Sequence, residues 1–259
     1  MKFGAALGAV VLVAALQPLA AATIPVRFAE GVTHGFLVLS GVDGVTLAHG
    51  DLFQVVRGGG EIDKRMIFHF KDGSVFDENV TFTQREVYIL KSYRLSERGP
   101  AFEGDREISM TPANGAYRVK LKDHKGGAER ILEGKLDLPA DVYNGLILTV
   151  VKNLPKGAGE VVHFVAFTPE PRLIELALTP AGEEKVAVGD LTKSATHYLM
   201  KPRLGMWLKF FAKILGRMPP DLHAWVVNGE VPAFVGFEGT MGTQGQVWRI
   251  ETVSPRRPG

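Results

Sequence analysis

The hydrophobic period of this chain changes abruptly at residues 137–155 (DLPADVYNGLILTVVKNLP). Asp137 suits the positive end of a helix, Pro139 suits its first turn, and a second proline ends the segment. Apolar residues at helical spacing form a stripe with apolar flanks, and the stripe consists of Val142, Leu146, Val150 and Leu154. Because a helix that is apolar almost all round is buried, the segment predicts a buried helix over 139–154, packed against or inside a curved sheet.

Two residues in the middle of this predicted helix are unusual for a helix interior. Gly145 costs about 1 kcal/mol relative to alanine at such a position, and we expect it to permit close approach of the helix to the sheet. Its neighbour Asn144 is polar on an otherwise apolar segment. We therefore expect Asn144 to face water or a partner.

Short strands and tight turns make up most of the remaining chain. Alternation such as Tyr117, Val119 and Leu121 between charged neighbours is typical of a sheet with one wet face. Residue pairs that tolerate positive φ mark hairpin turns at Asp43-Gly44, Asp72-Gly73, Asn114-Gly115 and Asn228-Gly229. The pattern predicts roughly eleven to thirteen strands, about seven of them before the helix. We expect a mainly β protein with a strongly curved antiparallel sheet or an incomplete β-barrel.

The first 22 residues have the features of a signal peptide. A positive start at Lys2 precedes an apolar run over 5–16, and small residues at 20–22 fit a cleavage site. The apolar run is shorter than the about 20 residues that span a bilayer. We expect cleavage near Ala22, export to a bacterial periplasm or out of the cell, and a single β-rich domain over 23–259.

Composition and charge exclude several classes of protein. The chain has no cysteine, so it has neither disulfides nor the lipid-modified cysteine of a bacterial lipoprotein. Its formal net charge is +2, without the clustered positive charge that nucleic-acid binding requires. No window after the leader is apolar for long enough to be a membrane helix. We expect no nucleic-acid partner and no integral membrane segment.

A second, amphipathic helix is predicted at 204–215 (LGMWLKFFAKIL), where Gly216 and two prolines end it. One face of this helix is apolar and aromatic, and lysines line the other side. Three interpretations remain open at this point. The helix covers one open end of the barrel, it forms a lid over an apolar cavity, or it lies on a membrane surface.

Signatures of common catalytic and metal sites are missing from the sequence. The seven histidines form no zinc-binding motif. No GxSxG elbow, no cysteine nucleophile and no common nucleotide-binding loop occurs. We therefore expect no metal and no cofactor.

One polar candidate is the pair Asp221 and His223, whose side chains would lie on the same side of a strand. A carboxylate beside an imidazole orients the ring as a base or a metal ligand. His197 and Glu230 are the nearest candidates for a third group. The alternative interpretation is an ordinary polar pair at a turn.

Distinctive short motifs lie along essentially the whole chain after the leader: Pro25-Val26-Arg27-Phe28, Glu30-Gly31, His34-Gly35-Phe36-Leu37, Phe68-His69-Phe70-Lys71-Asp72-Gly73-Ser74, Leu136-Asp137-Leu138-Pro139, Thr196-His197-Tyr198, and Pro219-Pro220-Asp221 through Trp225. Together they resemble an uncharacterised family of exported bacterial β-rich proteins, a domain of unknown function. More remotely, many strands with a buried mid-chain helix are similar to the half-barrels of periplasmic lipoprotein carriers. The resemblance implies a fold of this type but no catalytic residue, and fold does not determine function.

The function that we predict from the sequence is non-enzymatic. We expect a periplasmic or secreted protein that binds an apolar ligand, such as a lipid, or an apolar segment of an envelope protein, in the concave face of its sheet. The predicted lining residues are Tyr198, Trp207, Phe211 and Trp225. One alternative is an envelope scaffold or assembly protein that uses an exposed sheet edge. Another is a hydrolase of unrecognised type that uses His197, Asp221 and His223.

Overall fold

The computed structural model describes residues 23–167, 170–203, 221–241 and 246–253. Within these ranges the chain forms one sheet of fourteen antiparallel strands and one α-helix, together with two short 3₁₀ turns. The prediction of a mainly β protein with a strongly curved antiparallel sheet is confirmed. The second predicted helix, at 204–215, lies outside the described residues. No helix in the described part of the chain is long and apolar enough to cross a membrane.

The strands follow one another in the sheet in the order β8-β7-β6-β5-β4-β3-β2-β1-β14-β13-β12-β11-β10-β9. Two runs of hairpins therefore meet where β1 pairs with β14, and β8 and β9 form the two edges. The bounds are β1 (Thr33–Gly41), β2 (Thr46–Val56), β3 (Glu61–Phe70), β4 (Val75–Gln84), β5 (Tyr88–Arg98), β6 (Gly104–Thr111), β7 (Ala116–Asp123), β8 (Arg130–Lys135), α1 (Ile147–Asn153), β9 (Glu160–Phe167), β10 (Pro171–Val188), β11 (Leu191–Arg203), β12 (Leu222–Val227), β13 (Ala233–Thr240) and β14 (Val247–Val253).

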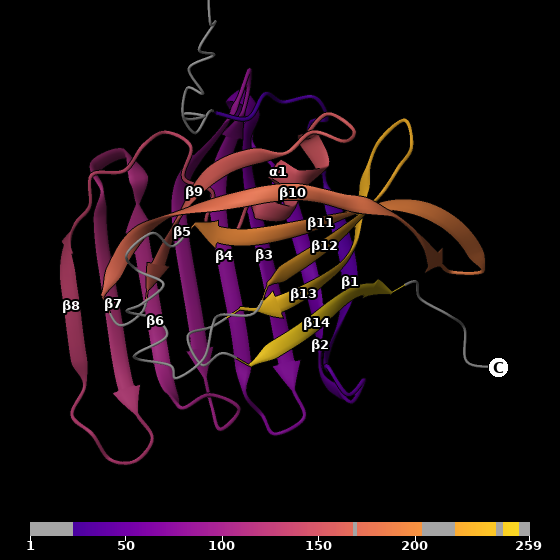
Figure 1. Ribbon diagram of the computed structural model, residues 1–259. Helices are drawn as coiled ribbons and strands as arrows, with labels where there is room; N and C mark the ends of the chain where they lie inside the picture. The colour runs from indigo at the N-terminus through magenta and orange to yellow at the C-terminus, as the bar shows by residue number, and fades with distance from the viewer. Residues whose placement is uncertain (1–22, 168–169, 204–220, 242–245, 254–259) are drawn as a thin grey trace, which may run out of the picture.

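The sheet curls so that its two halves face each other, with β9 to β13 crossing in front of β3 to β5 (Figure 1). Ring contacts connect the two halves. Trp248 of β14 lies edge-on to Phe76 of β4 with ring centroids 6.2 Å apart, and Tyr93 of β5 stacks on Phe167 of β9 at 6.1 Å. The buried side chains of the inner face form a shared hydrophobic core. The concave space inside this curl is where α1 lies.

The α-helix is much shorter than predicted, because only Ile147–Asn153 of the predicted 139–154 is helical. The residues before it pair with the edge of the sheet instead. The backbone N–H of Tyr143 donates to His163 O at 2.9 Å, and the N–H of His163 donates to Asp141 O at 3.2 Å. This pairing covers the edge of β9 and satisfies backbone groups that would otherwise be open for further strand pairing. The prediction of a helix over residues 139–146 is therefore wrong.

Gly145 does permit close approach to the sheet, although it precedes α1 and does not lie in a helix interior. Its φ is +69°, and a Cβ atom there would lie 2.4 Å from Val80 Cγ2 on β4. Asn144 is buried and does not face water. Its amide nitrogen donates to Val165 O at 2.9 Å, and its amide oxygen accepts from Val165 N–H at 2.8 Å. Asn144 therefore acts as one more strand-like partner for β9.

The segment 23–31 is attached to α1 through the side chains of Asn153 and Lys152, the latter in an ion pair with Glu30. Asn153 Oδ1 accepts hydrogen bonds from the backbone N–H groups of Arg27 (2.9 Å) and Phe28 (2.8 Å). The Tyr143 hydroxyl accepts a further bond from Ile24 N–H at 2.8 Å. This strap holds α1 at one end of the concave space and so fixes the geometry of the site below it.

Candidate binding site in the concave face

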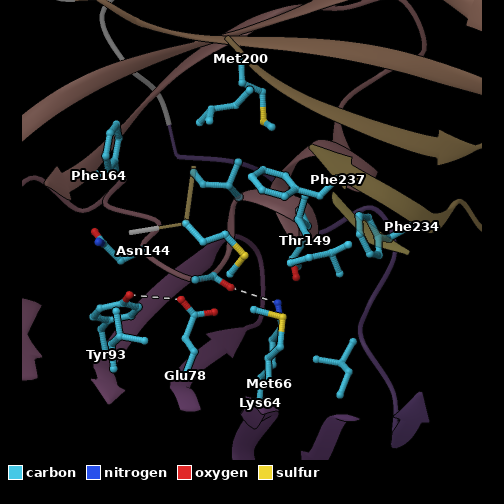
Figure 2. Close-up of a pocket in the computed structure, with 18 of the residues that line it drawn as sticks. Lys64, Met66, Glu78, Tyr93, Asn144, Thr149, Phe164, Met200, Phe234 and Phe237 are labelled. Carbon is cyan, nitrogen blue, oxygen red and sulfur yellow. Dashed lines mark hydrogen bonds between the residues drawn. The ribbon is translucent and has the colours of Figure 1, made fainter. Parts of the chain in front are cut away.

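A cavity of about 540 Å³ remains between α1 and the inner face of the sheet (Figure 2). Since a strand presents every second side chain to the same face, the apolar inner positions of both halves line it. Its wall includes Leu37, Met66, Leu95, Leu176, Met200 and Phe237 from the strands, and Ile147 and Leu148 from α1. The helix thus fills only part of the concave space.

The wall has one charged end, where Lys64, Glu78 and Tyr93 project from the neighbouring strands β3, β4 and β5 (Figure 2). The Tyr93 hydroxyl donates to Glu78 Oε1 at 3.2 Å. Lys64 Nζ donates to the Gly145 carbonyl at 3.0 Å. Lys64 and Glu78 are each only 8% exposed, so both ionisable side chains have very little access to water.

Burial sets the protonation behaviour of this charged end. It raises the pKa of the Glu78 carboxyl, and the nearby Lys64 and the bond from Tyr93 offset the effect only in part. It also lowers the pKa of the Lys64 ammonium, against the attraction of Glu78 and Glu30. The pKa of the Tyr93 hydroxyl is raised well above its usual value, chiefly by burial. Both Lys64 and Glu78 therefore carry a desolvation cost in their ionised forms.

The other buried carboxylates of the cavity region each have a cation. Glu30 Oε1 lies 2.5 Å from Lys152 Nζ, and Glu97 Oε2 lies 3.4 Å from Arg106 Nε. Among the described residues, Glu78 has no such contact with a lysine or arginine nitrogen within 4.0 Å. Of these three buried carboxyls, Glu78 is therefore the one without a lysine or arginine nitrogen at ion-pairing distance.

Of the predicted polar site, His197 and His223 lie together, on the face of the sheet opposite the cavity, and Asp221 does not join them. His197 Nε2 lies 2.8 Å from His223 Nδ1, and the imidazole of His197 stacks on Trp225 with ring centroids 4.9 Å apart. Glu184 accepts from the Trp225 indole at 2.9 Å and lies 3.0 Å from His197 Nδ1. Asp221 instead pairs with the Lys201 ammonium. The third member of the cluster is thus Glu184 and not the predicted Asp221.

Two of the residues predicted to line an apolar pocket, Tyr198 and Trp225, do not line this cavity. Tyr198 is buried in the core but does not line the cavity. Trp225 belongs to the histidine cluster on the outer face, since its neighbours along β12, Ala224 and Val226, are the ones buried inside. Trp207 and Phe211 lie outside the described residues.

The charged end of the cavity was missed, although the sequence contains a signal for it. In β3, Lys64 occupies the same parity as the buried Ile62 and Phe68, and in β4, Glu78 occupies the parity of the buried Phe76. An ionisable residue at an inward position of a strand is rarely placed there without a partner or a function. Two of them on adjacent strands are the pattern that indicates this site.

The fold and site define a class of protein in which one open antiparallel sheet curls around an apolar cavity with a charged end. Within the described residues, no group of three or more histidine, aspartate or glutamate side chains is arranged to hold a metal ion. Comparison with models of protein families, with curated proteins and with solved structures finds no match.

Proposed function

We propose that this protein binds an apolar ligand, such as a lipid chain, in the concave face of its sheet and catalyses no reaction on it. The observation that carries the proposal is the cavity of about 540 Å³ that α1 leaves unfilled. Its volume lies within the roughly 300–1,000 Å³ of small-molecule sites, which are mostly apolar with a few placed polar groups. An interior filled by side chains would have left no room for a ligand.

The leader at 1–22 supports an exported location for this binding. The remote similarity of many strands with a mid-chain helix to the half-barrels of periplasmic lipoprotein carriers supports the same interpretation, as an analogy of fold only. An apolar segment of an envelope protein is the other occupant that such a concave face would suit. A bound chain would cover apolar wall that is otherwise in contact with water, at about 25 cal/mol per Å² of apolar surface removed from water.

Mass spectrometry of the gently purified protein tests the proposal, with a Leu148→Trp variant for comparison. Leu148 lies on α1 and lines the cavity, so the larger indole should occupy ligand space. We expect a co-purifying apolar molecule in the natural protein and a reduced amount in the variant. Leu191→Trp, at an exposed position of β11, is the matched control and should retain the ligand. Repeated absence of any bound molecule, together with no uptake of added lipid, would refute the proposal.

A hydrolase that uses the histidine cluster is the second candidate, and the 2.8 Å contact between His197 and His223 favours it. Because Asp221 bonds Lys201, Glu184 would orient His197 in its place. Hydrolysis of a panel of chromogenic esters, and its loss in His197→Ala, would support this function. If the natural protein hydrolyses these esters no faster than the His197→Ala variant, the hydrolase function is excluded.

A further inference from the structure

We propose that the charged end of the cavity binds the head group of a single-chain carboxylate, so that the ligand class is a long-chain fatty acid or a close analogue. This inference rests on the proposed function, because it presumes that a chain occupies the apolar part of the cavity. It adds the chemistry of the head group, the residues that contact it and a limit on the size of the chain.

Lys64 and Glu78 both have unused hydrogen-bonding capacity at this end of the cavity. A lysine ammonium has three donors, and among the described residues Lys64 uses one of them, on the Gly145 carbonyl. Glu78 uses Oε1 to accept from Tyr93, and within the described chain Oε2 makes no hydrogen bond. Both side chains point to the same end of the cavity (Figure 2).

When Glu78 is protonated, the cations at this end outnumber the anions and favour an anionic ligand. Glu97 and Glu30 lie in ion pairs with Arg106 and Lys152. Lys64 has no carboxylate within ion-pairing distance in the described residues, although the charges of Glu78 and Glu30 attract it from farther away more strongly than that of Lys152 repels it. A buried cation without a paired anion is costly, so an incoming carboxylate would offset a cost that is already present in the empty site.

The protonation of Glu78 determines how a carboxylate would be held. Burial favours the protonated form of Glu78 by raising its pKa, and in that form the carboxyl donates a hydrogen bond from the oxygen that Tyr93 does not contact. One oxygen of the ligand carboxylate would accept from the Lys64 ammonium and the other from the Glu78 O–H. Hydrogen bonds of this charge-assisted kind are about twice as strong as neutral ones.

The volume of the cavity limits the number of chains. If a methylene group fills about the 30 Å³ that a water molecule fills in the liquid, a cavity of about 540 Å³ corresponds to about eighteen such groups. That is the size of one fatty acyl chain. A phospholipid with two such chains would exceed the described cavity by about twofold, which is why we infer a single-chain ligand.

Competition against Nile red, a neutral apolar dye, tests this inference with dodecanoic acid and dodecan-1-ol, which have the same chain length. We expect the delipidated protein to bind the acid at least about tenfold more tightly than the alcohol, a ratio that corresponds to about 1.4 kcal/mol. Lys64→Met should abolish this preference and still bind the alcohol. Lys91→Met, on the exposed side of β5, is the matched control and should retain the preference.

The outcomes separate the inference from the proposed function. Equal binding of acid and alcohol by the natural protein would overturn the head-group site and leave apolar binding intact. Binding of neither compound, with no binding of the dye, would overturn both. The comparison of acid with alcohol in the natural protein does not depend on whether Lys64→Met folds. The Glu78→Gln variant should keep most of the preference for the acid, because its amide N–H replaces the carboxyl donor.

Discussion

Lys64 and Glu78 lie at the same end of one cavity, yet their charged atoms do not form an ion pair with each other. Lys64 Nζ donates to the Gly145 carbonyl at 3.0 Å, and Glu78 Oε1 accepts from the Tyr93 hydroxyl at 3.2 Å. Two buried ionisable groups that could neutralise each other directly are instead held apart on neighbouring strands. The arrangement destabilises the empty protein and leaves polar atoms available to a ligand, a trade between stability and function that is common in binding sites.

Glu78→Gln should stabilise the empty protein more strongly at neutral pH than in acid. The folded-state pKa of Glu78 is raised above its unfolded value, so the favourable contribution of its protonated form is complete at low pH and is lost as the pH rises through the folded pKa. Glutamine has no charged form, so its contribution to the free energy of unfolding does not fall as the pH rises. Urea unfolding at about pH 4 and about pH 7 should show the difference between variant and natural protein growing with pH by on the order of 1 kcal/mol.

The control for this experiment is Glu103→Gln, an exposed carboxyl outside the cavity. It should change the free energy of unfolding equally at both pH values. If Glu78→Gln behaves like this control, the carboxyl is ionised in the folded protein without cost, and the interpretation of the charged end is wrong.

Gly145→Ala should destabilise the protein by about 2–4 kcal/mol, since it combines positive-φ strain with a steric clash. The φ of Gly145 is +69°, and the added methyl would lie 2.4 Å from Val80 Cγ2. Gly126→Ala is the matched control, because its φ is +90° but no atom lies within 4 Å of the added Cβ. It should cost only about 1 kcal/mol from the backbone. Chemical denaturation measures both, and equal losses would show that the contact with Val80 is not restrictive.

Asn153→Ala should release the strap over α1. Two backbone N–H groups, of Arg27 and Phe28, lose their acceptor, at a cost of about 1–3 kcal/mol for groups left unsatisfied. Amide hydrogen exchange is the direct measurement. Protection of these two amides should fall, while that of Val26, which donates to Glu86 O, serves as the internal reference. Unchanged protection would mean that the strap is held by its other contacts.

His197→Ala should change the environment of Trp225 without changing binding in the cavity. The imidazole of His197 stacks on the Trp225 indole at 4.9 Å on the outer face of the sheet, and the cavity wall lies on the inner face. We expect a shift in tryptophan fluorescence and the same dissociation constant for Nile red. A loss of dye binding of tenfold or more would show that the outer cluster is coupled to the cavity.

Hydrophobic alternation predicted the sheet because it depends on local sequence, where each strand shows its inner and outer faces directly. The extent of α1 was not predictable in this way. Asp141 and Tyr143 have helix-compatible neighbours, but their backbone groups pair with His163 on β9, which is a long-range contact. Helical propensity is a weak preference that such tertiary contacts override.

The candidate site was predictable only at the level of single residues. Lys64 and Glu78 break the apolar parity of β3 and β4, and that break is visible in the sequence. Whether the two side chains meet a filled core or a cavity depends on how far α1 enters the concave face. Likewise, His197 and His223 were expected to converge with Asp221, but the pairing of β11 with β12 and a salt bridge to Lys201 determine that Glu184 completes the cluster.

Calorimetric titration of the delipidated protein with dodecan-1-ol tests the central claim most directly, because it measures occupancy of the apolar cavity without the head group. We expect saturable binding at one site and a negative heat-capacity change, the signature of apolar surface leaving water. Leu148→Trp, which places a larger side chain in the cavity wall, should weaken this binding by at least about tenfold, or 1.4 kcal/mol, while Leu191→Trp leaves it unchanged. Absence of saturable binding in the natural protein, or equal binding in the Leu148→Trp variant, would contradict the claim that this cavity is a ligand site.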